Sequence, residues 1–453
     1  MNQLRQLIDR ARLIAFHIRS SFWAIPALLL VLAALLSVVN LWLDLNWANK
    51  LDLQPVKWLD ASKTFGIREL LSTTAAAILG VAGVSFSITI ASLTLASQQF
   101  GPRLIKNFMQ DRFIQTVLGF FVATFLYCML GIQFSSVVSE SASYTPVFTL
   151  ITTLVLTVVD LLLLVLFIHN ICVAIQVDTV ITGVSNDLHG RVNTLFPTST
   201  ENQLPADALE SIKIPFEQRG QDVLSNGDGY IQMVDIAGLV ECASKHNIQV
   251  QLMYRAGDYI MTRSVLARVI GDDIPEKIEK IINANVIKGA SRSPTQDMEY
   301  SIRQLVEIAL RALSPGINDP FTAMTCIDRL GSVVAMLAER PELPQRHLEE
   351  SGVMRVIVPT TTFTGLVDSA FNQIRQNAKG HVDVTIRLLE QLGEVILTLD
   401  SEEQIKVLHA QARLVESSMN DSDVQSYDRE AIEQRLMKIE RIVKNKRSAS
   451  EQA

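Results

Sequence analysis

The 453-residue sequence is poor in the residues that carry most enzyme chemistry. It has four cysteines and seven histidines, and neither type is grouped. No cysteine pair has C-x-x-C or zinc-type spacing, which favours reduced structural thiols and no metal site. H-E-x-x-H, G-x-S-x-G and Walker patterns are absent, and so are a phosphate loop, an internal repeat and a low-complexity tract. We therefore expect neither an enzyme nor a bound cofactor.

The first 177 residues also lack charge over long stretches. The uncharged windows are 20–43, 70–102, 113–139 and 141–177, the last interrupted by Asp160 alone. A helix needs about 20 apolar residues to cross the hydrocarbon core, so each window is long enough for one crossing. The first window is too long for a secretory signal, whose apolar part has about 7–15 residues. We predict four transmembrane helices in a domain at residues 1–177, with the lipid bilayer as their partner.

Positive charge is unevenly distributed over the segments that flank these windows. Four arginines precede the first window, and the connection 103–112 carries Arg103, Lys106 and Arg112. Short segments rich in Lys and Arg stay on the cytoplasmic side, so both of these segments are expected inside. The connections 44–69 and 139–146 have no excess of basic residues. We expect a multi-pass protein of the plasma membrane with both termini in the cytoplasm.

The residues after 177 are acidic, with 29 Lys and Arg against 39 Asp and Glu and a net charge of −10. An acidic domain repels the phosphates of DNA and RNA, so we expect no nucleic acid partner. Strand and turn patterns predict a mixed α/β module with a β hairpin at 178–292. Amphipathic patterns predict a helical region at 293–443, and the polar residues 444–453 predict a disordered tail. The predicted fold class is a four-helix α-helical transmembrane bundle with a cytoplasmic α+β domain.

The second window carries small and hydroxyl residues on two opposite helix faces. One face holds Gly80, Gly83, Ser87, Ala91 and Thr94, and the other holds Ser85, Thr89 and Ser92. Small residues let helix backbones approach closely, so we expect this helix inside the bundle with neighbours on both sides. Two interpretations of the second face stay open. Its hydroxyls either bond to their own helix and serve packing alone, or they line a polar path.

Asp160 is the one charged residue inside these windows, and no Lys or Arg lies inside them to pair with it. Such a carboxylate costs about 2.5–3.5 kcal/mol on insertion scales, and it usually faces a bundle interior or a water-filled cavity. Thr153 and Thr157 lie on roughly the same side of the helix, toward the outer leaflet. Asp160 is therefore expected either to bond to a neighbouring helix as a neutral acid, or to be ionised in a wet vestibule reached past these threonines.

Residues 314–320 form a corner between two predicted helices. The string Ser293-Pro294-Thr295-Gln296 has the pattern of a capping box that opens the first helix, which must end before Pro315. Asp319 and Pro320 cap and begin the second helix. As structure, this corner is a helix–helix joint. As function, the free amides of the second helix, together with Ser314, Asn318 and Asp319, would bind a small anion or the carboxylate of a protein partner.

Three strings in the chain resemble a known family. They are Ala96–Arg103, Ile302–Val306 and Leu313–Pro320, and the last contains Ser-Pro-Gly-Ile-Asn-Asp-Pro. They are similar to a bacterial family of predicted inner-membrane proteins of unassigned function. The resemblance implies a membrane protein with a cytoplasmic domain, and it implies no reaction. Such sequences tend to have a glycine a few residues after Gly257-Asp258, whereas this chain has Thr262-Arg263-Ser264. The resemblance therefore does not predict a tight turn at that position.

Two functions fit these observations. The first is a homo-oligomeric ion-conducting pore or transport protein with a cytoplasmic regulatory domain, because four spans are few for a transporter that works as a monomer. The second is a non-conducting membrane sensor or scaffold whose cytoplasmic domain binds a ligand or partner near residues 314–320. The polar stripe and Asp160 favour the first, and the capped corner favours the second.

Overall fold

The computed structural model of the protein describes residues 23–47, 64–101, 111–138, 146–197, 216, 220–420 and 425–450. The chain divides after Thr179 into two compact units, unit 1 and unit 2. Much of the three connections that were used to predict the orientation lies outside the described residues, as do residues 451–453 of the predicted tail. The two units are described separately below.

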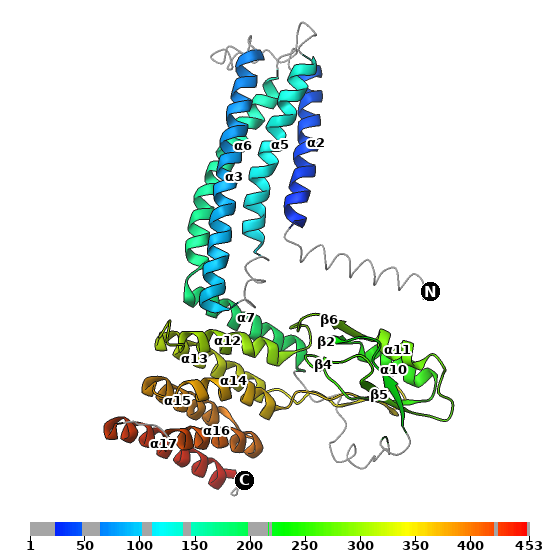
Figure 1. Cartoon of the computed structure of the whole chain (residues 1–453), viewed down its shortest axis with the longest axis vertical. Coiled ribbons are helices and arrows are strands. Elements are labelled where there is room, and N and C mark those ends of the chain that lie inside the picture. The colour runs from blue at the N-terminus through cyan, green and yellow to red at the C-terminus, as the bar shows by residue number, and fades with distance from the viewer. Residues whose placement is uncertain are drawn as a thin grey trace. The chain divides into compact units, whose positions relative to one another are not determined.

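Unit 1 is a bundle of long apolar helices (Figure 1). They are α2 (Ala24–Asn46), α3 (Thr64–Phe100), α5 (Arg112–Val138) and α6 (Val147–Ala174). Helix α5 contacts each of the other three, and its Phe121 and Tyr127 are fully buried among them. Its Gly119 allows the closest approach, because a Cβ atom there would lie 2.8 Å from Leu29 Cδ1 and 2.9 Å from Pro26 Cα of α2.

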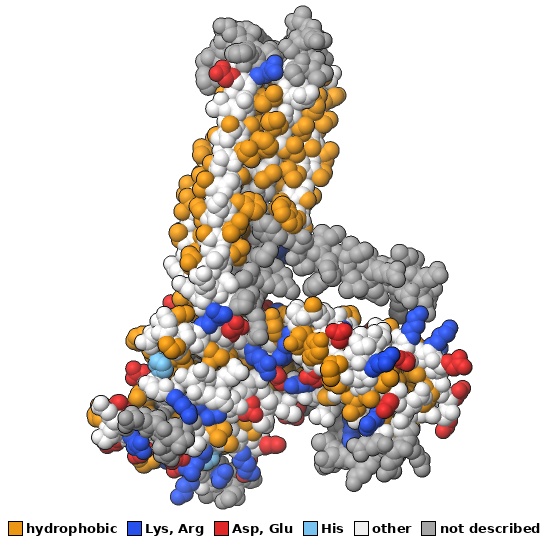
Figure 2. All heavy atoms as spheres, viewed as in Figure 1, with side chains coloured by type: hydrophobic (Ala, Val, Ile, Leu, Met, Phe, Trp, Pro, Cys, Tyr) orange, Lys and Arg blue, Asp and Glu red, His pale blue; other side chains and the backbone are white. Residues whose placement is uncertain are grey.

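The outer surface of the bundle is covered by large hydrophobic side chains (Figure 2). Leu28, Leu162 and Val165 are each more than half exposed, and many similar residues lie beside them on α2 and α6. A surface of this kind is stable against lipid and would aggregate in water. Backbone groups in the interior of a helix bond within that helix, which a lipid environment requires.

Five helices in the described part of the chain are long and apolar enough to cross a membrane. Four of them are α2, α3, α5 and α6, which overlap the predicted windows. The fifth is α13 (Pro320–Ala338), which packs in unit 2 against α12, α14 and α15. Length and composition alone therefore do not separate α13 from the bundle helices, whereas its packing partners do.

The predicted placement of α3 between neighbours on both sides is wrong for the single chain. Ser85 and Thr89 are buried against the bundle, but Gly80, Gly83 and Ser87 are exposed. A Cβ atom added at either glycine would meet no atom within 4 Å. The reason is geometric, since α3 is covered on one side by α5 and α6 and a four-helix bundle leaves its other side open.

Unit 2 contains stacked helices and two small sheets (Figure 1). Its helices outside the sheet module are α7 (Val177–Leu195, which begins in unit 1), α12 (Met298–Ala312), α13, α14 (Phe363–Asn377), α15 (Val382–Thr398), α16 (Glu402–Asn420) and α17 (Ser426–Ser450). Successive pairs α12·α13, α13·α15 and α15·α17 are in contact, so these helices form consecutive layers. Their buried leucine, isoleucine and valine residues follow helical spacing, which forms the apolar faces between layers.

The strands of unit 2 form one five-stranded and one three-stranded sheet. The first has the order β1 (Gln221–Leu224), β5 (Val265–Ile270), β3 (Gln249–Leu252), β8 (Met354–Ile357) and β7 (Arg346–Leu348). The second has the order β4 (Tyr259–Ile260), β2 (Gly229–Val234) and β6 (Val286–Gly289). Helices α10 (Ile236–Lys245) and α11 (Ile278–Ala284) pack on them around one apolar core. Because β8 pairs in parallel with β3, the larger sheet takes strands from both sides of the boundary predicted at residue 292.

Several predicted helix ends are confirmed, and one is wrong. Asp319 caps α13, as its position indicated, and Asp235 caps α10 in the same way. The capping box at 293–296 does not form, because α12 begins at Met298 and its N-terminal cap is Asp297. Gln296 instead accepts a hydrogen bond from the Val234 amide at 2.9 Å and donates one to the Val234 carbonyl at 3.1 Å.

Two further predictions differ from the structure. The tail from residue 444 is helical as far as Ser450, because α17 continues and Lys446 Nζ donates to the Leu399 carbonyl at 2.7 Å. A tight turn also forms at 262–264 without glycine, with Arg263 in the left-handed region at φ +67°. The Arg263 amide donates to the Ser225 carbonyl at 2.9 Å, and this bond offsets part of the backbone strain.

Candidate functional site

Asp160 lies in the interior of the bundle, with 1 % of its surface exposed. Neither carboxyl oxygen has a hydrogen-bond partner among the described residues, and the buried hydroxyl of Thr124 on α5 is also without one. Thr124 and Cys128 are the side chains of α5 that face this carboxyl group. Asp160 is therefore a buried acid whose nearest polar side chain on α5 is the hydroxyl of Thr124.

The hydroxyl residues predicted to line a path are mostly bonded to their own helices. Thr153 Oγ1 donates to the Thr149 carbonyl at 2.8 Å, and Thr157 Oγ1 donates to the Thr153 carbonyl at 2.7 Å. Thr89 Oγ1 donates to the Ser85 carbonyl at 2.8 Å. Ser85 is buried with no partner for its hydroxyl among the described residues, and Ser92 is half-buried. These bonds match the packing interpretation for the threonines and leave Ser85 open.

A second carboxylate of the bundle, Asp44, was not predicted as a site residue. It was assigned to a loop, but it lies in α2 and is 2 % exposed. Its oxygens accept hydrogen bonds from the amides of Phe148 and Thr149 at 2.7 and 3.2 Å and from Thr149 Oγ1 at 2.6 Å. Asp44 thus caps the N-terminus of α6 from another helix, where Pro146 provides no side-chain cap of its own.

Asn40 extends this polar cluster by one helical turn. Its Nδ2 atom donates to the Tyr127 hydroxyl at 2.8 Å and to Thr152 Oγ1 at 2.9 Å. The cluster therefore joins α2, α5 and α6 at one end of the bundle. The spacing of Ser37, Asn40 and Asp44 would have indicated it, because residues three and four apart share one helix face and all three are buried.

The corner at 314–320 is held by its own backbone. The amides of Ile317 and Asn318 donate to the Ser314 carbonyl, and the Asp319 amide donates to the Ala312 carbonyl at 2.8 Å. Ser314 Oγ donates to the Arg311 carbonyl at 2.6 Å, and Asn318 is in the left-handed region at φ +51°. The Asp319 carboxylate accepts from the Thr322 amide and hydroxyl at 3.2 and 2.5 Å. The position predicted for an anion is thus occupied by a carboxylate of the chain itself.

Unit 2 contains a cavity of about 190 Å³ where the sheets meet the helical layers. Its walls are mostly apolar, from Leu195, Phe196, Val234, Ile236, Ala256, Met298, Leu343, Pro344, Val358 and Pro359. Arg255, Gln296, His347, Thr360 and Thr361 complete the lining. An apolar cavity with a few polar groups is the usual form of a small-molecule site. No sequence motif indicated it, because its residues come from six separate segments.

An ionic cluster supports the cavity at Arg255. Arg255 Nη2 forms an ion pair with Glu299 Oε1 at 2.6 Å, and Nη1 donates to the Thr361 hydroxyl. Beside it, Arg292 makes a bidentate contact with Asp297 at 2.7 and 2.8 Å. Burial raises the pKa of Asp297, and the Arg292 charge opposes that shift. The cluster joins the β4 side of the sheets to the start of α12, so it holds the cavity walls in place.

Helix α7 connects this cavity to the last bundle helix. It begins three residues after α6 ends at Ala174, and it ends at Leu195, which lines the cavity. One face of α7 is buried through Ile181, Leu188 and Val192. Arg191 Nη1 also donates to the Pro294 carbonyl at 2.9 Å, next to the start of α12. In the chain, α7 therefore lies between α6 and the cavity wall, and residues 175 and 176 separate it from α6.

Among the described residues, no group of three His, Cys, Asp or Glu side chains is placed to hold a metal ion. His347 lines the cavity, and burial lowers its pKa, so its imidazole is the neutral form at pH 7. Arg355 and Glu349, which lie near it on the β7–β8 hairpin, pair with each other at 2.7 Å.

The fold and these sites define an integral membrane protein, with a bundle of apolar helices followed by an α+β unit. Residues 19–394 match the family described as "Predicted membrane protein (DUF2254)", so the chain belongs to this family. The resemblance inferred from the three sequence strings is confirmed at this level. The family description assigns no reaction.

Relatives of the chain include the uncharacterised proteins Rv1290c of Mycobacterium tuberculosis and Mb1321c of Mycobacterium bovis. Each is 29 % identical to this chain over 345 residues, which cover 72 % of this chain and 63 % of the relative. The chain thus spans less than two thirds of the length of these relatives. No solved structure matches the chain.

Proposed function

We propose that the protein is a membrane sensor, in which unit 2 binds a small molecule and α7 passes the bound state to the membrane helices. One observation carries this proposal, namely that the cavity lies at the end of α7, the helix that follows α6 in the chain. This placement of unit 2 on the cytoplasmic side of a bacterial inner membrane, with both termini inside, is part of the proposal. It follows from the distribution of Lys and Arg.

The cavity suits a ligand with an apolar body. Its volume is about 190 Å³, compared with the roughly 150 Å³ of an engineered cavity that binds benzene. Phe196 and Leu195 at the end of α7 form part of its apolar wall, so a bound molecule would contact α7 directly. A ligand that fits only one position of α7 shifts the protein toward that position, in proportion to its differential affinity.

The test uses the full chain in detergent and a set of small aromatic and aliphatic compounds. Ala256→Trp should fill the cavity, and Met261→Trp is the matched control because Met261 is 66 % exposed outside it. We expect at least one compound to raise the Tm of the wild type and the control but not of Ala256→Trp. Hydrogen exchange in α7 should slow with the same compound. Tm shifts that are equal in all three proteins would refute the proposed site.

A second candidate is a homo-oligomeric ion-conducting pore or transport protein, and Asp160 favours it. Its carboxyl group is desolvated and unpartnered among the described residues, which is costly unless it has a role. Such a path would require several copies, because the helices of one bundle pack around buried side chains such as Phe121 and Phe167. On this candidate, Asp160, Ser85 and Thr89 face the path in one conformation of the assembly.

Ion flux from liposomes tests the second candidate. Asp160→Asn should change selectivity or flux, whereas Asp178→Asn, on the exposed first turn of α7, should not. If wild-type protein carries no ion under any voltage or gradient, conduction is excluded under those conditions. The sensor proposal does not depend on this outcome, because its readout is ligand binding.

A further inference from the structure

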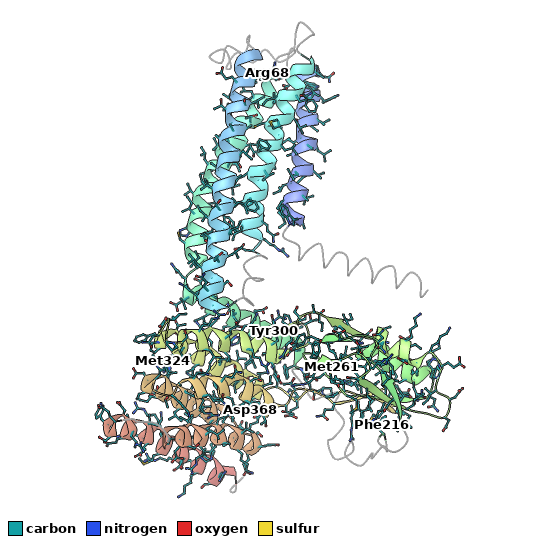
Figure 3. All side chains as sticks on the ribbon, in the orientation of Figure 1. Arg68, Phe216, Met261, Tyr300, Met324 and Asp368 are labelled. Atoms are coloured by element: carbon teal, nitrogen blue, oxygen red, sulfur yellow. The ribbon has the colours of Figure 1, made fainter. Side chains whose placement is uncertain are left out.

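Helices α7 and α13 of unit 2 are joined by a seam of polar side chains. Arg329 Nη2 of α13 donates to Thr182 Oγ1 of α7 at 3.5 Å, and Arg340 Nη2, just after α13, donates to Asn193 Oδ1 at 2.5 Å. Both pairs are 147 residues apart, so the two helices run side by side in the same direction. Figure 3 places Met324, near the start of α13, at the end of the helical layers away from the sheets. The seam therefore runs from that end toward the sheets.

A third contact of the seam lies between the two arginine pairs. Ser332 Oγ is 3.3 Å from His189 Nε2, and His189 Nδ1 is 2.7 Å from the Ser185 carbonyl oxygen. Because a carbonyl oxygen only accepts, Nδ1 donates to it, and in a neutral imidazole Nε2 then accepts from the serine hydroxyl. The three contacts that cross the seam thus involve two positive charges and no carboxylate.

The two arginines of the seam differ from other arginines of unit 2 in their partners. Arg191 and Arg387 each pair with an aspartate, at 2.8 and 2.7 Å. Among the described residues, no carboxylate lies within 4.0 Å of the Arg329 or Arg340 guanidinium group, and Asp328, which precedes Arg329, is the partner of Arg387. The chain after residue 177 is acidic overall, so two arginines without carboxylate partners on one seam favour an anionic ligand.

The spacing of the two arginines limits what kind of anion can reach both. Arg329 and Arg340 are three helical turns apart, about 16 Å along the helix axis, and their partners Thr182 and Asn193 have the same spacing on α7. A single phosphate group is too small to contact both guanidinium groups. A chain of linked phosphates can follow the seam, and the exposed hydroxyl of Ser332 lies between the two ends.

We propose that this seam binds a short linear polyphosphate, either inorganic or as part of a nucleotide, with Arg329 and Arg340 at its two ends. Arginine binds phosphate oxygens through two parallel hydrogen bonds, which are stronger than bonds to neutral acceptors. The ligand would thus replace the 3.5 Å contact between Arg329 and Thr182 with charge-assisted bonds. The site uses none of the residues that line the cavity, so it can be tested independently of the proposed sensor function.

The experiment is calorimetric titration of the full chain in non-ionic detergent, with inorganic tripolyphosphate and adenosine triphosphate as the two probes. Arg329→Gln and Arg340→Gln each remove one charge from the seam. The control is Arg441→Gln, because Arg441 is exposed on α17 and has no carboxylate partner among the described residues. We expect each seam variant to bind roughly tenfold or more weakly than the wild type, since hydrogen bonds to charged groups are the strong ones, and the control to bind like the wild type.

The two probes distinguish the sources of the phosphates. Equal binding of both probes would show that the phosphate chain is sufficient, and binding of adenosine triphosphate alone would identify a nucleotide, and either result with weaker binding by both seam variants supports the proposal. Equal weakening in all three variants would show a general effect of charge and overturn it. No binding of either probe by the wild type, or full affinity in Arg329→Gln and Arg340→Gln, would overturn it as well.

Discussion

Two buried aspartates of the bundle have opposite surroundings. Asp44 accepts three hydrogen bonds at the start of α6, whereas Asp160 has no partner among the described residues. A buried carboxylate with several donors stabilises the fold, and one without donors costs free energy. Asp44 is therefore part of the architecture, whereas the burial of Asp160 is not offset by comparable donors.

Replacing Asp44 with alanine should destabilise the bundle. The change leaves the Phe148 and Thr149 donors without an acceptor, and an unsatisfied buried donor costs about 1–3 kcal/mol. Asn46→Ala is the control, since the exposed Asn46 side chain donates to the Trp42 carbonyl of its own helix. Thermal unfolding in detergent should show a lower Tm for Asp44→Ala alone. Equal Tm values for the two variants would contradict the capping role.

Glu349 gives the protein a predictable response to acid. Hydrogen bonds from Arg355, Ser244 and Ser351 lower the pKa of the Glu349 carboxyl to about 2. The unfolded value is about 4.3, so the stabilisation is complete above that pH and is lost as the pH falls toward 2. The stability difference between wild type and Glu349→Gln should be largest near pH 6 and narrow below about pH 4. Urea unfolding followed by circular dichroism measures it, and a difference independent of pH would refute the assignment.

At the scale of single elements, the bundle helices differ in how their glycines are used: one lies in a tight contact between two helices, and others are exposed. Helix α5 lies against α2 so tightly at Gly119 that a methyl group has no room. Helix α3 instead turns Gly80 and Gly83 outward, where a methyl group would meet nothing. The same residue type thus serves packing on one helix and leaves an open stripe on the other.

Gly119→Ala should force α2 away from α5. The added Cβ would lie 2.9 Å from Pro26 Cα, a backbone atom that cannot move aside as a flexible side chain does. Overpacking of this kind typically costs about 1–3 kcal/mol. Gly66→Ala on α3 is the matched control, because nothing lies within 4 Å of its Cβ position. Thermal unfolding in detergent should separate the two, and a Gly119→Ala protein as stable as the control would show that α2 adapts freely.

At the scale of the whole molecule, the open stripe on α3 bears on assembly. Gly80, Gly83, Ser87 and Ala91 give a surface on which two helices can approach closely, and such surfaces commonly join membrane helices. The homo-oligomer expected from the sequence would use this surface. The other feature at this scale is α7, which follows α6 in the chain and ends at the cavity of unit 2.

Gly80→Leu should dissociate the oligomer if the stripe joins copies of the chain. The added leucine side chain would project from this surface and keep the two backbones apart, although Gly83, Ser87 and Ala91 remain small. Val84→Leu is the control, because Val84 is exposed on the same helix and already carries a branched side chain. Native mass measurement in detergent gives the number of copies. A monomeric wild type, or a Gly80→Leu protein with the same mass as the wild type, would exclude this interface.

Local patterns in the sequence predicted much of the fold. The apolar windows located α2, α3, α5 and α6, and Asp319 marked the start of α13. Each of these depends on residues that are neighbours in the chain. The start of α12 was missed because Gln296 bonds to Val234, which lies 62 residues away, and the next residue then becomes the cap.

Among the candidate sites, the sequence by itself determined that Asp160 is buried in an apolar helix and that residues 314–320 form a capped corner. Only the tertiary structure decided which groups meet there. It brought Asp44 to the start of α6, filled the predicted anion position with Asp319, and assembled a cavity from six segments. The physical reason is that hydropathy and capping act over a few residues, whereas hydrogen bonds between helices and cavity walls depend on contacts between residues far apart in the chain.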